Sequence, residues 1–335
     1  ARWRHRRSYM DVRTRNRKHR TRKTRNDKLK RIFALLLTLT LALTTLTACG
    51  RQETAAKSGF VVACTTYPVY LMTQAVTQDV PDVTVKLVVN QQLSCLHNYT
   101  LTMSDMKAIE SADLLVINGA GLESFLDDVL ESRDYWDASR DMPLRHAEEG
   151  HDHGDHDHDE THEEYDPHYW LSPTLPGQMA QNIAVGLTTK DPAHMDAYQA
   201  NADQVSEQLT ALQEELRAEV ADLPCKELIP FHDGFAYFAD AFGLTILASV
   251  EEEEGSEASA REINELTQLI QTHHIPCVFI EKNGSDSAAQ ALARECGVSV
   301  AALDMGMSGD EAGGGLAAYE ALLRRNIDTI REAYT

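Results

Sequence analysis

Three histidines and one aspartate stand where strands or stiff turns are expected to end. They are His97, His168, His232 and Asp304. Neutral imidazole nitrogens and carboxylate oxygens are ligands of Zn²⁺, and three nitrogens with one oxygen complete its usual tetrahedral shell. The chemistry that these residues suggest is therefore the binding of a divalent metal ion. No general base in a substrate pocket is evident beside them, so we expect no enzymatic activity.

The four side chains come from both halves of the chain. His168 lies in the turn Asp166-Pro167-His168, which its proline stiffens. The other three follow predicted strands, His97 across a short loop and the other two directly. Those strands are 83–89 before His97, 227–231 before His232 and 298–303 before Asp304. Ligands of open parallel α/β sheets bind beyond the carboxyl ends of strands, so we expect the four residues to converge.

Each of these residues, taken alone, is also compatible with an ordinary structural role. His232 could be a buried core histidine and Asp304 a turn cap. Cys95, two residues before His97, is a further candidate ligand. We assign no function to the helix-associated histidines His194, His273 and His274.

A second group of histidines lies in a loop predicted over 146–165. Its members alternate with acidic residues and glycine, and almost no apolar side chain separates them: His146, His151, His153, His156, His158 and His162. Such a segment has too few apolar residues to form a core, and its imidazoles offer many weak auxiliary sites for zinc, copper or nickel.

One stretch of this loop matches the dinuclear metal pattern H-x-H-x-D-H of metallo-β-lactamase-like hydrolases. The match consists of His151, His153, Asp155 and His156. That pattern functions when a strand end presents the residues rigidly, and the residues before it, 145–150, indicate no strand. This segment therefore gives little support to the alternative that the protein is a secreted zinc hydrolase.

The charge of the chain excludes one class of partner. Its 335 residues carry 52 Asp and Glu against 31 Lys and Arg, a formal net charge of −21. The basic residues are concentrated in 1–31, so everything that follows is still more acidic. An acidic body repels phosphate backbones, and we expect no nucleic-acid partner.

The N-terminus has the features of an export signal. A basic segment precedes the apolar run 32–46, which at about 15 residues is short for a membrane-spanning helix. Leu46-Thr47-Ala48-Cys49 resembles a bacterial lipobox, in which the cysteine is lipidated. We predict an extension and signal peptide over 1–48, lipidation of Cys49, and a polar tether over 49–58 that holds the protein at the outer face of the cell membrane.

The other five cysteines give no redox or zinc-ribbon signature. They are Cys64, Cys95, Cys225, Cys277 and Cys296. Their odd number leaves at least one thiol free or bound to another molecule, and no CxxC occurs. Any pairing among them stays open.

Beyond the tether, short apolar runs alternate with helical patterns, which indicates an α/β fold with buried parallel strands. Predicted strands are 60–65, 83–89, 114–118, 227–231, 244–250, 277–281 and 298–303, with helices at 70–80, 104–111, 233–242, 259–273 and 286–296. Apolar residues at steps of three and four predict a long helix near 192–223. We therefore expect an N-terminal lobe over 59–190, a linker helix over 191–223 and a C-terminal lobe over 224–335.

Several motifs in the predicted order resemble those of the metal-binding lipoproteins of bacterial zinc ABC transporters, the ZnuA-like receptors. The matching stretches are Thr65-Thr66-Tyr67-Pro68, His97-Asn98-Tyr99 with Ser104-Asp105, Ala112-Asp113-Leu114, Asn118-Gly119, Gly121-Leu122-Glu123, Asp166-Pro167-His168-Tyr169-Trp170-Leu171, His232-Asp233 with Phe235, and Leu303-Asp304. They extend over nearly all of the chain after residue 60.

The resemblance implies two lobes, each with a four-stranded, mostly parallel sheet, joined by a rigid helix, with metal held between them. It places the metal on His97, His168 and His232, with Asp304 as the acidic partner. Two departures are Asn98 after the first histidine and Met305 where the family usually has proline. They leave water or Glu281 as other candidates for the fourth position.

We therefore expect an extracytoplasmic, monomeric zinc receptor that delivers Zn²⁺ to an ABC transporter permease. A manganese or iron receptor of the same fold is the nearest alternative. A histidine at position 232 favours zinc, because manganese prefers oxygen ligands. An additional role as a surface adhesin stays open.

Overall fold

The structure is a computed structural model that describes residues 59–91, 96, 99–147, 165–250, 259–311 and 314–335. The predicted signal peptide, Cys49 and the tether lie outside the described residues. So do His97, Cys95 and the loop histidines His151, His153, His156, His158 and His162. Among the residues that are described, no helix is long and apolar enough to cross a membrane.

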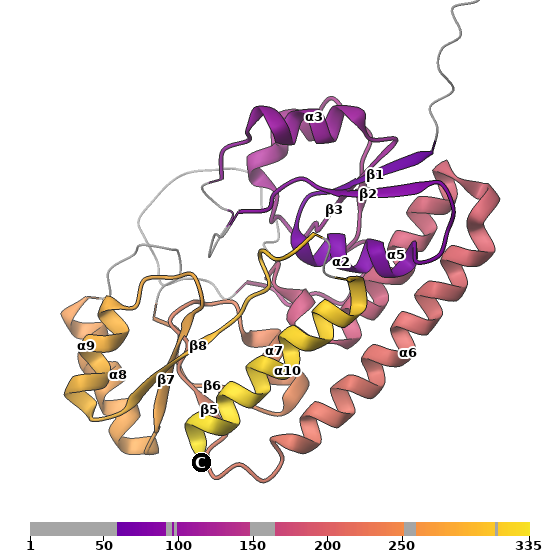
Figure 1. The fold of residues 1–335 in the computed structure, drawn as a ribbon. Coiled ribbons are helices and arrows are strands. Elements are labelled where there is room, and N and C mark those ends of the chain that lie inside the picture. Colours follow the sequence, from indigo (N-terminus) through magenta and orange to yellow (C-terminus); the bar gives the residue numbers. More distant parts are fainter. Residues whose placement is uncertain (1–58, 92–95, 97–98, 148–164, 251–258, 312–313) are drawn as a thin grey trace, which may run out of the picture. The chain divides into compact units, whose positions relative to one another are not determined.

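The N-terminal half is built on a sheet of parallel strands in the order β2-β1-β3-β4. These strands are β1 (Phe60–Cys64), β2 (Val83–Leu87), β3 (Leu114–Ile117) and β4 (Trp136–Asp137). The first three confirm the predicted strands, and every residue of β3 is buried. Continuous apolar sequence suits a strand that is covered on both faces. Figure 1 shows α3 on one side of this sheet and α2 with α5 on the other.

Two helices come after strands of this sheet in the chain. Helix α2 (Tyr67–Val76) begins shortly after β1 ends, with Pro68 in its first turn. Helix α3 (Met103–Ser111) is capped by Thr102, whose hydroxyl accepts a hydrogen bond from the Asp105 N–H while the Asp105 carboxylate accepts one from the Thr102 N–H. Helix α3 therefore begins one residue before the predicted start at 104, because the reciprocal pair of Thr102 with Asp105 satisfies two backbone donors at once.

Between the halves run α5 (Thr174–Lys190), a 3₁₀ turn (Pro192–His194) and α6 (Met195–Glu219). The buried residues of α6 keep the predicted spacing: Tyr198, Ala202, Val205, Leu209, Leu212 and Leu216. This stripe packs against α5, and α6 also contacts α2, α7 and α10. Helix α5 was not predicted, because its stretch carries Pro176 and two glycines, which weaken the helical signal. Packing against α6 overrides that propensity.

The C-terminal half has two pairs of parallel strands, β5-β6 and β7-β8. Their bounds are β5 (Glu227–Leu228), β6 (Thr245–Ile246), β7 (Cys277–Glu281) and β8 (Ser299–Leu303). A parallel bridge between Pro230 and Phe279 connects the pairs. The first two strands are shorter than the predicted 227–231 and 244–250. Pro230 has no N–H to continue the ladder, which explains the early end of β5.

Helices cover both faces of these strands (Figure 1). They are α7 (Ala236–Phe242), α8 (Ala260–His273), α9 (Ser287–Cys296) and α10 (Gly315–Tyr334). Side chains alternate along β7, so Cys277 and Phe279 belong to the large core that continues into the N-terminal half, whereas Val278 belongs to a smaller core under α8 and α9. Short elements η1 (Ser124–Leu126), α4 (Asp127–Leu130) and η2 (Tyr169–Leu171) complete the described fold.

Candidate metal centre

His168 and His232 lie side by side although they are far apart in the sequence. Their ring centroids are 5.3 Å apart and the ring planes are nearly perpendicular, at 87°. Both residues are buried, with 7% of their surface exposed. His168 directly precedes η2, and His232 follows the bridged segment that extends from β5. The structure thus brings together two of the predicted ligands.

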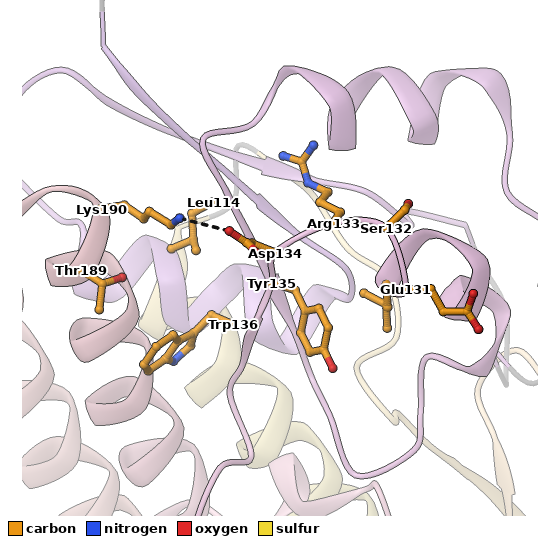
Figure 2. Close-up of a pocket in the computed structure, with 10 residues that line it drawn as sticks. Leu114, Glu131, Ser132, Arg133, Asp134, Tyr135, Trp136, Thr189 and Lys190 are labelled. Atoms are coloured by element: carbon orange, nitrogen blue, oxygen red, sulfur yellow. Dashed lines mark ion pairs between the residues drawn. The ribbon is translucent and has the colours of Figure 1, made fainter.

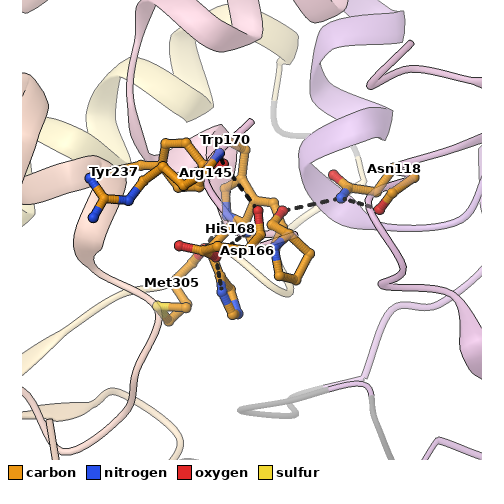
Figure 3. A network of polar contacts seen from close by, with 9 residues as sticks. Asn118, Arg145, Asp166, His168, Trp170, Tyr237 and Met305 are labelled. Carbon is orange, nitrogen blue, oxygen red and sulfur yellow. Dashed lines mark hydrogen bonds and ion pairs between the residues drawn. The ribbon is translucent and has the colours of Figure 1, made fainter. Parts of the chain in front are cut away.

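Asp166 fixes the orientation of the His168 ring. Its Oδ1 accepts a hydrogen bond from the His168 backbone N–H at 2.9 Å and lies 2.8 Å from the ring Nδ1 (Figure 3). A carboxylate at Nδ1 favours the tautomer whose proton is on that nitrogen, which leaves the Nε2 lone pair to bind a metal. Histidine ligands of zinc commonly have such a partner. This contact fits a metal centre.

The turn that carries His168 is clamped from several directions. The indole N–H of Trp170 donates to the Met305 carbonyl at 2.8 Å, and the Tyr319 hydroxyl donates to the Trp170 carbonyl at 2.6 Å. On the opposite side, the Asn118 side-chain amide donates to the Pro167 carbonyl at 3.2 Å. Elements of both halves therefore hold this one turn in place.

Close packing beside the two imidazoles requires a glycine. A Cβ atom added to Gly234 would lie 2.6 Å from the Met305 Cε, 2.9 Å from His232 Cδ2 and 3.2 Å from His168 Cδ2. Any larger residue at 234 would push one of these side chains away. The Met305 side chain is thereby placed next to the histidine pair.

Asp304, the predicted acidic ligand, contacts cations of the protein in the structure. Its Oδ2 lies 2.9 Å from the Lys282 ammonium and 3.9 Å from the Arg325 guanidinium, while Oδ1 accepts from the Gly306 N–H at 2.9 Å. No three His, Cys, Asp or Glu side chains of the described residues are grouped so that they could hold one ion. Of the predicted ligands in the described part of the chain, only His168 and His232 are observed in contact with each other.

His146 closes the base of the histidine-rich loop. It forms an antiparallel bridge with Tyr165, and the two rings stack with centroids 5.0 Å apart. The Asp166 N–H donates to the Arg145 carbonyl, and the Tyr237 hydroxyl accepts from the Arg145 N–H and donates to the Asp166 carbonyl. The base of the loop is therefore hydrogen-bonded directly to the residue that orients His168.

Glu123 is a residue whose role the sequence did not reveal. It is buried, and its carboxylate accepts hydrogen bonds from the Thr65 hydroxyl (2.7 Å) and from the N–H groups of Asn118 (2.6 Å) and Gly119 (3.0 Å). It thereby joins the carboxyl ends of β1 and β3. The Asn118 carbonyl accepts from the Tyr169 hydroxyl at 2.7 Å, so Glu123 also supports the His168 turn. An acid in the apolar stretch Gly119–Leu126 was the available signal.

The described cysteines form no disulfide. Cys64, Cys225, Cys277 and Cys296 are all free thiols. Burial raises the pKa of the Cys64 thiol to about 12, so this group stays protonated and unreactive at neutral pH. Neither the metal pair nor its supports include a described cysteine.

A surface hollow of about 550 Å³ lies apart from the histidine pair. It is lined by residues of the loop before β4 and of the end of α5, with Lys190 paired to Asp134 at 3.7 Å (Figure 2). The Trp136 ring in its wall lies against Gly186 on one side and under the Arg140 guanidinium. None of the predicted metal ligands lines it.

The fold and the carboxylate-oriented histidine pair define an α/β protein with a candidate metal centre at His168 and His232. A family model described as "Zinc-uptake complex component A periplasmic" (ZnuA) matches residues 62–333. The chain belongs to the ZnuA family.

Curated relatives and a solved structure agree with this assignment. The zinc-binding lipoprotein AdcA of Streptococcus pneumoniae serotype 4 is 29% identical over 285 residues, and the alignment covers 82% of this chain. The high-affinity zinc uptake system protein ZnuA of Bacillus subtilis is 26% identical over 299 residues, covering 85% of this chain and 92% of that protein. A Zn(II)-bound variant of AdcAII from S. pneumoniae has a TM-score of 0.69 at 25% identity, covering 83% of this chain and 99% of the other.

The AdcA relatives extend beyond the region that this chain matches. The chain spans only 57% and 55% of the AdcA proteins of Streptococcus pyogenes and S. pneumoniae. The similarity to AdcA is thus a similarity to about half of that protein.

We predict that Glu123 makes the stability of the protein pH-dependent. Burial raises the pKa of Glu123 from 4.5 to about 7, so the folded state holds its proton more tightly than the unfolded state. The resulting stabilisation is complete below pH 4.5 and is lost as the pH rises to about 7. By linkage it amounts to about 3 kcal/mol. Denaturant unfolding at several pH values measures this loss.

Glu123→Gln carries no titrating group at this position, so its unfolding free energy should fall less between pH 5 and 7.5 than that of the unmodified protein. Glu131→Gln, which removes an exposed carboxyl, is the control for net charge. Equal pH slopes for Glu123→Gln and the unmodified protein would contradict this account.

Proposed function

We propose that this protein is an extracytoplasmic receptor that binds Zn²⁺ with high affinity and delivers it to the permease of an ABC transporter. The observation that carries the proposal is the buried contact of His168 with His232, with Asp166 on the first ring. Two adjacent imidazoles, one of them with a carboxylate partner, suit zinc, and manganese would favour a site richer in oxygen. Membership in the zinc-uptake family supports this choice of metal.

The complete ligand set in this proposal is His97, His168 and His232 with Asp304 in the fourth position. Glu281 is the other carboxylate candidate, because it is buried at the carboxyl end of β7, opposite Leu303 in the β7-β8 register. Four protein ligands would leave no open position on which water could be activated. The proposed activity is therefore capture and release of the ion without chemical change.

The arrangement of ligands follows from a two-lobed architecture, which is also part of this proposal. One lobe comprises 59–190 and the other 224–335, with α6 as the rigid connection between them. Its 25 residues give a helix of roughly 38 Å, long enough to reach along both lobes. The clamps on the His168 turn support a site assembled from both.

Location and partner complete the proposal. Cys49 in the lipobox would carry the lipid that anchors a monomeric receptor beside the permease, as the lipoprotein name of a relative supports. The histidines of the loop at 146–165 would raise the local zinc concentration. The Asp166 N–H donates a hydrogen bond to the Arg145 carbonyl at the base of this loop. Zinc ions bound by the loop would therefore be held on a segment attached directly beside His168.

We expect His232→Ala to abolish high-affinity zinc binding, because it removes one of the imidazoles at the centre. The matched control is His194→Ala: His194 pairs with an aspartate as His168 does, but at the turn between α5 and α6. Isothermal titration calorimetry with Zn²⁺ on the purified protein measures both. Retention of full affinity by His232→Ala would refute the assignment, whereas loss of affinity in both variants would show an unspecific effect on folding.

A second expectation concerns the carboxylate behind His168. Replacing Asp166 with alanine should weaken zinc binding about 10- to 100-fold, because the ring would lose its fixed tautomer and orientation. Asp191→Ala is the control, since Asp191 lies 2.6 Å from the Nδ1 atom of His194, away from the centre. Competition with a zinc-chelating dye measures the change. An affinity that stays within about twofold of the unmodified protein would show that Asp166 has no such role.

A further inference from the structure

The carboxylate of Asp304 lies among protein cations. Lys282 approaches its Oδ2 to 2.9 Å, closer than Arg325 at 3.9 Å, and only 16% of the Asp304 side chain is exposed. Lys282 itself is 59% exposed. The ammonium group can therefore leave for solvent easily, whereas the carboxylate stays inside the protein.

The backbone at Asp304 is fixed, so only its side chain is free to change partner. The Asn326 side chain accepts from the Asp304 N–H and donates to the Asp304 carbonyl, both at 2.8 Å. Lys282 is fixed nearby by its own N–H, which donates to the Leu303 carbonyl at 2.9 Å. An exchange of partners would thus need rotation of the Asp304 side chain without any rearrangement of β8.

The neighbour of Asp304 in the chain already lies at the histidine pair. The Met305 side chain packs at Gly234, where it is next to the rings of His168 and His232. The Cα atoms of Asp304 and Met305 are consecutive and therefore about 3.8 Å apart. In the proposed function, the Asp304 carboxylate would have two competing cations: the Lys282 ammonium and an ion held by the histidines.

We propose that Lys282 is an affinity-determining residue that competes with zinc for Asp304. This inference rests on the proposed function. Zinc capture exchanges the lysine–carboxylate pair for a zinc–carboxylate bond, and zinc release re-forms the pair. The ammonium thereby weakens zinc binding and gives the carboxylate a partner when the ion departs. The Lys282 end of the pair is 59% exposed, and ion pairs open to solvent contribute little to stability, so this effect amounts to about two- to fivefold in the dissociation constant.

Lys282→Met should therefore bind zinc about two- to fivefold more tightly than the unmodified protein. Lys190→Met is the matched control: it removes the same charge from another lysine–aspartate pair, at the surface hollow. Calorimetric competition titrations with Zn²⁺ on the purified variants measure the dissociation constants. Equal constants for Lys282→Met and Lys190→Met would overturn the proposal.

A double-mutant cycle with Asp304→Asn separates direct competition from the general field of the lysine charge. If the two residues act on each other, Asp304→Asn weakens zinc binding more in the Lys282→Met background than in the unmodified protein. If Lys282→Met tightens binding equally with Asp304→Asn present, the lysine acts through space alone and the proposal is wrong.

A zinc-loaded crystal structure provides a second readout, in which the Lys282 ammonium should have left Asp304. A Lys282–Asp304 pair that persists beside bound zinc would overturn the proposal. Failure of the proposed function is distinguishable from failure of this inference. If the proposed function is wrong, the unmodified protein itself shows no high-affinity zinc binding that depends on His232.

Discussion

The contact between the Asp166 carboxylate and the His168 ring is the constraint on which the proposed metal centre depends. A histidine on a free loop samples many rotamers, whereas Asp166 binds both the ring and the backbone N–H of His168. The ring is fixed relative to its own chain before any ligand arrives. Buried side chains fixed in this way lose little entropy on binding, which favours high affinity.

That contact functions only because the surrounding turn is fixed as well. Trp170 and Tyr319 connect the turn to the C-terminal half, and Asn118 connects it to the end of β3. Further bonds cross between the halves at the segment after β8, where Tyr70 donates to the Glu311 carbonyl at 2.8 Å. The His168–His232 distance is thus determined by many distant contacts, and a movement of either half would change it.

The sequence allowed the strands β1, β3, β7 and β8 to be predicted well, because short continuous apolar runs bounded by polar residues are typical of buried parallel strands. It also predicted that His168 and His232 converge, with His168 in a proline-stiffened turn and His232 directly after a predicted strand. Strand lengths were less predictable. The truncation of β5 depends on Pro230, and α5 forms through packing against α6 despite its glycines and proline.

The partners of Asp304 and the role of Glu123 could not be predicted from the sequence. Lys282 lies 22 residues before Asp304, and only the β7-β8 register brings the two together. Glu123 stands out as an acid in an apolar stretch, but its hydrogen-bond donors at the ends of two strands follow from the fold alone. His97 and most of the loop histidines lie outside the described residues, so their predicted roles stay predictions.

An anomalous difference map at the zinc absorption edge, from crystals of the protein grown with Zn²⁺, tests the central claim most directly. We predict one strong peak about 2.0–2.1 Å from a ring nitrogen of each of His97, His168 and His232, with a carboxylate oxygen completing the shell. Zinc found only on histidines of the loop at 146–165, with no ion shared by His168 and His232, would contradict the account.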